Sequence, residues 1–181
     1  MGKKIVSNIY EIASIVLTSI IAIVILFTAC FRLVGVEGSS MLPTLTNGDW
    51  LLCSASTTTY EYGDIVIIVQ PNALNKPIVK RVIATEGQVV DIDFEEGIVY
   101  VDGVALDEPY TNSLTYDEED FIGPVTVEEG CVFVMGDNRN ASTDSRSSLI
   151  GQIDTRYILG KVIGRIYPFG SFDVYENFTS D

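Results

Sequence analysis

The stretch Gly38-Ser39-Ser40-Met41-Leu42-Pro43-Thr44-Leu45 lies between a long apolar run and an Asn47-Gly48-Asp49 turn. Pro43 fixes its own φ and pushes the residue before it towards an extended conformation. Gly38 lacks a Cβ, so another chain can approach the backbone closely there. A plain surface turn between two strands explains the same residues, because Ser, Gly and Pro dominate turns. Ser40 is therefore a candidate nucleophile only if the rest of the sequence provides a partner for its hydroxyl.

Upstream, the twenty residues 12–31 carry no charge and are mostly Ile, Val, Leu and Ala. As a helix they rise about 30 Å, the thickness of a bilayer core. Lys3 and Lys4 precede the run, so the positive-inside rule places the short tail in the cytoplasm. A cleaved signal peptide, or lipoprotein processing near Cys30, is the alternative, but signal-peptide apolar regions span only about 7–15 residues. We expect a cytoplasmic tail over 1–11, a retained transmembrane anchor over 12–31 and an extracytoplasmic domain over 32–181.

Composition removes several classes of function. The net charge is −14, from 25 acidic and 11 basic residues, which argues against nucleic acid as a partner. The chain has no histidine, so Ser-His-Asp and Cys-His mechanisms and the commonest zinc ligand are excluded. Its three cysteines, Cys30, Cys53 and Cys131, lack metal-ligand spacing. We expect no metal and no other cofactor. Whether Cys53 and Cys131 pair stays open, although buried free thiols are favoured.

After residue 32 the pattern becomes that of strands. The β-branched run Ile65–Val69 suits a strand that is buried on both faces, and Asp102-Gly103 is typical of a hairpin turn. The acidic, turn-rich part from Asp107 to Gly130 predicts a solvated excursion. The fold class is therefore mainly antiparallel β. Strands are expected at 50–53, 65–69, 78–83, 89–94, 98–101, 104–106, 131–135, 157–159 and 162–166.

Without histidine, a lysine beyond the anchor is the candidate base for Ser40. Strand alternation places Lys80 on one face with Ile78 and Val82, where loss of hydration lowers the pKa of the amine. Lys76, beside Pro77, is typical of an exposed turn, and the pattern does not decide Lys161. An edge-strand lysine that blocks aggregation is the alternative interpretation of Lys80.

A third stretch, Gly136–Arg146, follows a predicted apolar strand and is almost entirely small or charged. A flexible polar loop is one interpretation. Two Asp and two Arg in so short a span favour a loop that is held by ion pairs. Ser142 in this loop is a candidate to orient the lysine amine through a hydrogen bond.

Taken together, and with the anchor in front, these stretches resemble the bacterial type I signal peptidases, membrane-anchored Ser-Lys proteases, in the compact form of Gram-positive bacteria. The resemblance covers nearly the whole chain to Pro168. It rests on Ser40-Met41-Leu42-Pro43-Thr44, on Gly63-Asp64-Ile65-Val66, on Lys80-Arg81-Val82, and on Gly136-Asp137-Asn138-Arg139 with Ser142, Asp144 and Arg146.

This resemblance implies a Ser40 nucleophile and a Lys80 general base, with Ser142 as the second serine of the cluster. It implies that the Ser40 N–H holds the oxyanion, and that Gly38 stands where some members have a second donor hydroxyl. Asp137 and Asp144 would pair with Arg81 and Arg146. By the same match, the pocket for a small side chain before the cleaved bond would be formed by Val36, Leu45, Ile78 and Val79.

The implied reaction is the cleavage of signal peptides from exported preproteins, after small residues in A-x-A sites, at the outer membrane surface. The signal peptide and the bilayer are then the partners. Alternatives are a self-cleaving Ser-Lys protease of the SOS-repressor type and a non-catalytic factor for pilus or surface-protein assembly. Two departures from the family pattern, Asn140-Ala141 and 84–88, concern local loop geometry. Residues from about 89 to 130 correspond to the family's variable subdomain, onto which the resemblance carries no function.

Overall fold

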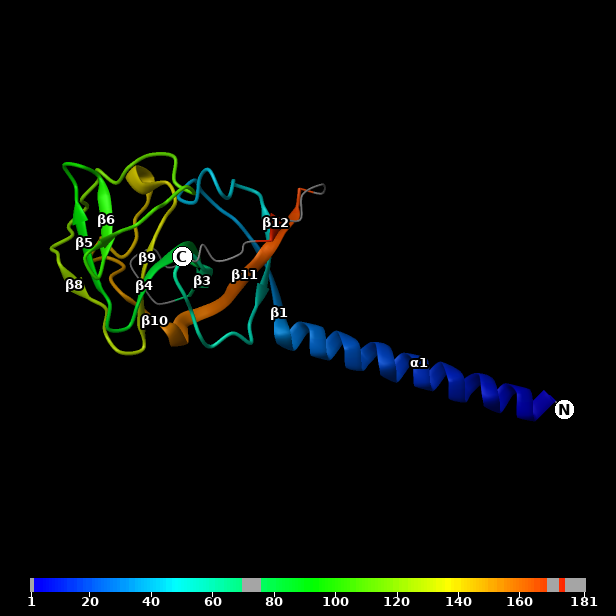
Figure 1. The fold of residues 1–181 in the computed structure, drawn as a ribbon. Coiled ribbons are helices and arrows are strands. Elements are labelled where there is room, and N and C mark those ends of the chain that lie inside the picture. Colours follow the sequence, from blue (N-terminus) through cyan, green and yellow to red (C-terminus); the bar gives the residue numbers. More distant parts are fainter. Residues whose placement is uncertain (1, 70–75, 169–172, 175–181) are drawn as a thin grey trace.

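The computed structural model describes residues 2–69, 76–168 and 173–174. A single long helix, α1 (Gly2–Cys30), projects from a β domain (Figure 1). Its segment Asn8–Cys30 has a mean hydropathy of 2.7 and is not buried inside the molecule, so it is long and apolar enough to cross a membrane. The helix ends one residue before the expected end of the anchor, because Phe31 already pairs with Ser54 in a sheet.

The larger sheet has eight strands, and every recorded pairing in it is antiparallel. Its order is β1-β2-β11-β3-β4-β9-β10, with β12 beside β11. The strands are β1 (Phe31–Gly35), β2 (Trp50–Ser54), β3 (Ile65–Ile68), β4 (Ile78–Thr85), β9 (Cys131–Met135), β10 (Ile153–Asp154), β11 (Ile158–Tyr167) and β12 (Asp173–Val174). Two short 3-10 helices, η1 (Arg139–Ala141) and η2 (Thr155–Tyr157), lie in the connections.

The smaller sheet has four strands in the order β7-β6-β5-β8. They are β5 (Val89–Asp93), β6 (Ile98–Val101), β7 (Val104–Ala105) and β8 (Val125–Thr126). The β6–β7 hairpin turns at Asp102-Gly103, where both residues have positive φ, as a tight two-residue hairpin requires. In Figure 1, β5, β6 and β8 lie on the side of the β domain away from α1.

The core divides according to strand alternation. In β3, Ile65 and Ile67 pack into one apolar cluster, whereas Val66 and Ile68 pack into the cluster on the opposite face. All four side chains are buried, which confirms the expected two-faced strand. A third cluster joins the end of β4 to the smaller sheet through Ile83, Ala84 and Val90.

The mainly β fold is confirmed, with differences in detail. The two strands expected at 157–159 and 162–166 are one continuous strand, β11, which passes through Gly160 and Lys161. The sequence pattern did not predict β1, β8, β10 or β12, each of five residues or fewer. All three cysteines are free thiols, with Cys53 buried and Cys131 half-buried.

Candidate active site

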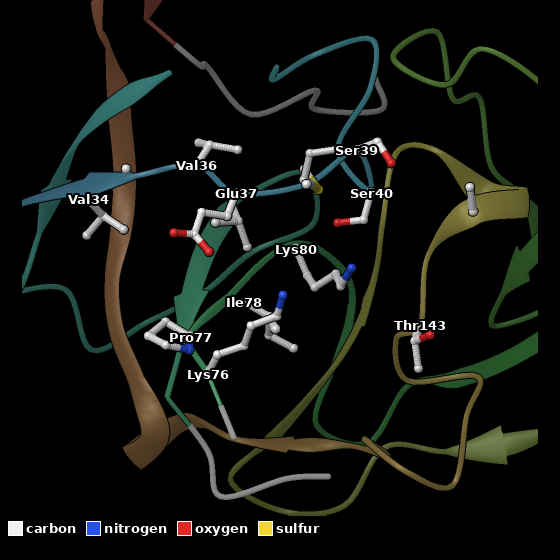
Figure 2. A pocket seen from close by; sticks show the side chains of 15 residues that line it. Val34, Val36, Glu37, Ser39, Ser40, Lys76, Pro77, Ile78, Lys80 and Thr143 are labelled. Atoms are coloured by element: carbon white, nitrogen blue, oxygen red, sulfur yellow. The ribbon is translucent and has the colours of Figure 1, made fainter. Parts of the chain in front are cut away.

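A cleft of about 370 Å³ lies between the segment that follows β1 and the start of β4. Residues 34–41 form one wall, 76–80 form the other, and Ala141 and Thr143 also line it. Ser40 and Lys80 both line this cleft, and Figure 2 shows the serine hydroxyl and the lysine amine at the same end of it. The structure thus brings the two candidate residues, 40 positions apart in the sequence, into one cavity.

Lys80 is held deep in the sheet with only 3% of its surface exposed. Its neighbours on the same face, Ile78 and Val82, belong to an apolar cluster. Burial lowers the pKa of the amine to about 8; the charge of Asp144 opposes this shift, and that of Arg146 adds to it. A substantial fraction of Lys80 is therefore neutral near pH 8, and a neutral amine can accept a proton.

Ser142 connects Lys80 to a buried carboxylate. Lys80 Nζ donates to Ser142 Oγ at 2.9 Å, and Ser142 Oγ donates to Asp144 Oδ2 at 2.8 Å. Burial acts to raise the pKa of Asp144, but hydrogen bonds and the charges of Arg146 and Lys80 lower it below its usual value. Asp144 thus stays ionised and keeps the serine hydroxyl turned so that its oxygen faces the amine.

Arg146 holds Asp144 in place and also hydrogen-bonds to backbone carbonyls of the surrounding segments. Its Nε lies 2.9 Å from Asp144 Oδ1 and its Nη2 lies 3.0 Å from Oδ2, a two-point pairing in which both side chains are fully buried. The same guanidinium donates to the carbonyls of Arg139 and Asp117, at 2.7 and 2.6 Å. Gly136 N donates to Asp144 Oδ2 at 2.9 Å, so the carboxylate also orders the start of the loop.

Asp137 joins three segments that are far apart in the sequence. Arg81, next to Lys80 in β4, binds it through Nε at 2.8 Å and Nη2 at 2.6 Å. Thr44, from the turn that carries Ser40, donates its hydroxyl to the same carboxylate. The Arg81 guanidinium also lies over the Tyr110 ring, 3.9 Å from its centroid. Asp137 thereby holds together the turn that carries Ser40 (residues 38–45, the serine turn), strand β4 with Lys80, and its own loop (residues 136–146, the polar loop).

Gly136 allows the polar loop to reach the serine turn. A Cβ at this position would lie 2.2 Å from Ser142 Oγ and 2.5 Å from Ser40 O, so only glycine fits. The neighbouring Asn138 bonds to the serine turn directly: its N donates to Ser40 O at 3.0 Å, and its Nδ2 donates to Ser39 O at 3.1 Å. The close approach of the two backbones places Ser142 beside Ser40.

The acidic excursion is not wholly solvated, which corrects the expectation from its charge. Glu108 pairs with both terminal nitrogens of Arg139, at 2.5 and 2.6 Å, and Thr115 accepts from the same guanidinium at 3.0 Å. Asn140 Oδ1 accepts the backbone N–H groups of residues 116 and 117. The excursion therefore packs on the polar loop, because the buried Arg139 needs a carboxylate partner.

Sequence reasoning missed Glu108, although a signal was present. Arg81, Arg139 and Arg146 require three anionic partners when buried, whereas the polar loop provides only Asp137 and Asp144. The remaining carboxylate had to come from elsewhere in the chain.

The other candidate residues lie in different environments. Val36, Ile78 and Val79 line the cleft, whereas Leu45 is fully buried in an apolar cluster with Met41 and is not part of the lining. Gly38 lines the cleft with a φ of +95°.

The two remaining lysines beyond the anchor also have defined positions. Lys76 is exposed at the rim of the cleft, and Lys161 pairs with Asp64 at 2.6 Å. In the part of the chain that the structure describes, no cluster of three His, Cys, Asp or Glu side chains could hold a metal.

The chain is similar to known proteins over most of its length. Residues 9–167 match the family model described as signal peptidase, peptidase S26. A signal peptidase I of Bacillus caldolyticus is 38% identical over 76% of this chain and 80% of its own. A signal peptidase IB of Staphylococcus aureus is 33% identical over 90% of this chain and 93% of its own. The crystal structure of a signal peptidase I from Enterococcus faecalis aligns with 59% of this chain and 98% of its own, at 30% identity and a TM-score of 0.48.

Proposed function

The chain belongs to the signal peptidase family, peptidase S26, and is therefore a serine protease that removes signal peptides; from this premise we propose that Ser40 and Lys80 form its catalytic pair. The observation that carries the proposal is the environment of Lys80. Its amine is buried among apolar side chains, has a lowered pKa and is held by Ser142 within the cleft that Ser40 also lines.

In the proposed mechanism, neutral Lys80 takes the hydroxyl proton of Ser40 as the serine oxygen attacks the scissile carbonyl. The ammonium that forms passes this proton to the departing amine, which leaves an acyl-enzyme. Water then attacks the ester, with Lys80 again as the base. Ser142 orients the amine throughout, and the Ser40 N–H stabilises the oxyanion of each tetrahedral intermediate.

The cleft also suggests how the substrate lies. A signal peptide in extended conformation fits between the 34–38 segment and the beginning of β4, where backbone groups can pair with it as an added strand. Val36, Ile78 and Val79 make this part of the cleft apolar. We propose that small side chains before the cleaved bond, as in A-x-A sites, are selected here.

We further propose that Asn8–Cys30 anchors the enzyme with its β domain outside the membrane. The substrate's own apolar segment lies in the same bilayer. Holding both in one membrane raises their effective concentration without any additional contact.

The test is cleavage of a preprotein with an A-x-A site by the detergent-solubilised full chain. Ser40→Ala and Lys80→Ala should each lose activity by at least about a hundredfold, because nucleophile and base are both required. Ser39→Ala removes the neighbouring hydroxyl and should keep most of the activity. Cleavage at the wild-type rate by either Ser40→Ala or Lys80→Ala would rule out the pair. A wild-type chain that cleaves no preprotein would favour the non-catalytic alternative.

A further inference from the structure

We propose that Asn138 is a positioning residue that aims the Ser40 N–H into the cleft, where it meets the developing oxyanion. This inference rests on the proposed function, since it concerns the same serine. It adds a role for an amide side chain of the polar loop that the serine–lysine pair does not explain.

The carbonyls of residues 39 and 40 both accept hydrogen bonds from Asn138. Asn138 Nδ2 donates to Ser39 O at 3.1 Å, and Leu42 N donates to the same carbonyl at 3.2 Å. The Asn138 backbone N donates to Ser40 O at 3.0 Å. One residue of the polar loop thus holds two successive carbonyls of the serine turn.

The planar peptide bond between Ser39 and Ser40 links the direction of the carbonyl to that of the N–H. The Ser39 carbonyl and the Ser40 N–H belong to one peptide unit, and in a trans peptide they point in opposite directions. A donor that fixes the carbonyl on one side therefore fixes the N–H on the other. Among the residues that the structure describes, Ser40 N donates to no acceptor, so its N–H is available to a ligand in the cleft.

The Ser40 N–H must be held rigidly, because an oxyanion donor is effective only when it is already oriented. On its N-terminal side the serine turn depends on Gly38, which is held by one hydrogen bond from its N–H to Asn47 Oδ1 at 2.9 Å. Asn138 instead belongs to a loop that is braced by buried ion pairs on either side, at Asp137 and Arg139. Asn138 thus transmits the rigidity of this loop to the peptide that carries the donor.

This role predicts a specific kinetic effect. The Ser40 N–H is needed when the carbonyl oxygen becomes negatively charged, so a misdirected N–H lowers kcat and leaves KM nearly unchanged. Asn138→Asp keeps the size of the side chain and the backbone N–H, but replaces the amide donor by an acceptor that repels Ser39 O. We expect kcat to fall by about ten- to a hundredfold, with KM within about twofold of wild type.

A peptide aldehyde that ends in Ala-x-Ala provides a second readout. Ser40 Oγ adds to the aldehyde carbon, its proton passes to Lys80, and the carbonyl oxygen becomes the oxyanion of the hemiacetal. The aldehyde should bind the variant more weakly by the same factor as the loss in kcat. In the neutral variant Asn138→Ser, which adds no charge, the pH midpoint of the activity should stay at the wild-type value, because Asn138 forms no hydrogen bond with Lys80.

Controls separate this role from a general loss of structure. Asn140→Ala removes an amide of the same loop that faces residues 113–117, so it should reproduce a loss of thermal stability without the matched losses in kcat and aldehyde affinity. If Asn138→Asp does not fold, Asn138→Ser gives the same comparison. Wild-type kcat and aldehyde affinity in the folded variant would overturn the proposal, as would a change confined to KM or to the pH midpoint. Inactive Ser40→Ala and Lys80→Ala in the same assay would support the catalytic pair even if the role of Asn138 fails.

Discussion

The burial of the Lys80 amine both destabilises the folded chain and suits the lysine to act as a base. The apolar surroundings remove water from the charged form and lower its pKa, which makes the lysine less stable as a cation and more effective as a base. Ser142 and Asp144 limit the freedom of the amine without a direct carboxylate contact, which would restore the positive charge.

The lowered pKa predicts the pH dependence of cleavage. Only neutral Lys80 accepts a proton, so the rate should rise about tenfold per pH unit below the pKa of about 8 and level off above it. Asp144, whose pKa lies below its usual value, remains ionised throughout this range. Initial rates of preprotein cleavage between pH 5 and 9 provide the measurement. A rate that does not change down to pH 5 would exclude a neutral lysine base.

The same pKa predicts a gain in stability when the lysine is removed. A shift from 10.5 to about 8 corresponds to a destabilisation of about 3 kcal/mol, which is present in full below pH 8, declines as the pH rises from 8 to 10.5 and is absent above 10.5. Lys80→Met should therefore be more stable than wild type at pH 7, by up to this free energy, and should unfold at a higher temperature. The variant should also be inactive, because it lacks the base. The difference should shrink at pH 10. Thermal unfolding in detergent tests this, and a less stable Lys80→Met at pH 7 would contradict it.

At the scale of elements, the serine turn depends on backbone conformation as much as on side chains. Gly38 adopts a φ of +95°, which L-residues rarely adopt, although a Cβ there would meet no atom within 4 Å. The constraint is thus the backbone angle and not space. Val36, before this turn, pairs through its backbone with Gly48 and Asp49 after it, and Asn47 Oδ1 accepts a hydrogen bond from Gly38 N.

Gly38→Ala should test this constraint. It should destabilise the chain by about 1 kcal/mol through its left-handed φ and lower kcat/KM by about tenfold or more, because the turn shifts Ser40. Gly87→Ala is the matched control, since Gly87 has a φ of +80°, equally free space and no contact with the cleft. It should lose similar stability and keep its activity. Equal activity losses in the two variants would show that strain at Gly38 has no local effect on the serine.

The acidic excursion acts as a brace for the polar loop. Arg139 is 1% exposed, and the side chain of its partner Glu108 is 12% exposed, so the pair is largely shielded from solvent. Removing one partner of a buried pair leaves an uncompensated charge, whereas an exposed pair contributes little.

Glu108→Gln should therefore lower the free energy of unfolding by about 3 kcal/mol. Asp154→Asn removes the acidic partner of Arg156, whose side chain is 84% exposed, and should leave the free energy of unfolding almost unchanged. Denaturant unfolding of both variants gives the comparison. Equal stabilities for the two would show that the excursion does not brace the loop.

At the scale of the whole molecule, the sheet carries the candidate catalytic segments, and the proposed anchor helix would set their distance from the membrane. α1 leads directly into β1, and the segment after β1 forms a wall of the cleft, so only the nine residues 31–39 separate α1 from Ser40 (Figure 1). The proposed anchor would therefore hold the cleft close to the bilayer surface, where a signal peptide leaves the membrane.

The proposed orientation can be measured by labelling. A membrane-impermeant maleimide should label Ala105→Cys, at an exposed site in β7, on intact cells. Asn8→Cys, at the opposite end of the membrane segment, should be labelled only after the cells are disrupted. Both signals are compared with wild type, which contains three native cysteines. The reverse pattern would place the β domain in the cytoplasm.

Local sequence determined the long helix, most of the strands, and Ser40 and Lys80 as candidate residues. These features depend on neighbouring residues: apolar runs, period-two alternation, and an absence of histidine that left few bases. Short strands such as β1 and β10 were not predicted, because so few residues show too little periodicity to indicate a strand.

Only the tertiary structure decided which distant groups meet. The Glu108–Arg139 pair, the Lys161–Asp64 pair and the hydrogen bonds from Asn138 to residues 39 and 40 each join segments far apart in the chain. Their spacing in the sequence holds no period that would indicate contact. Strand order and register bring them together, and the need of buried charges and polar groups for partners then decides which of them pair.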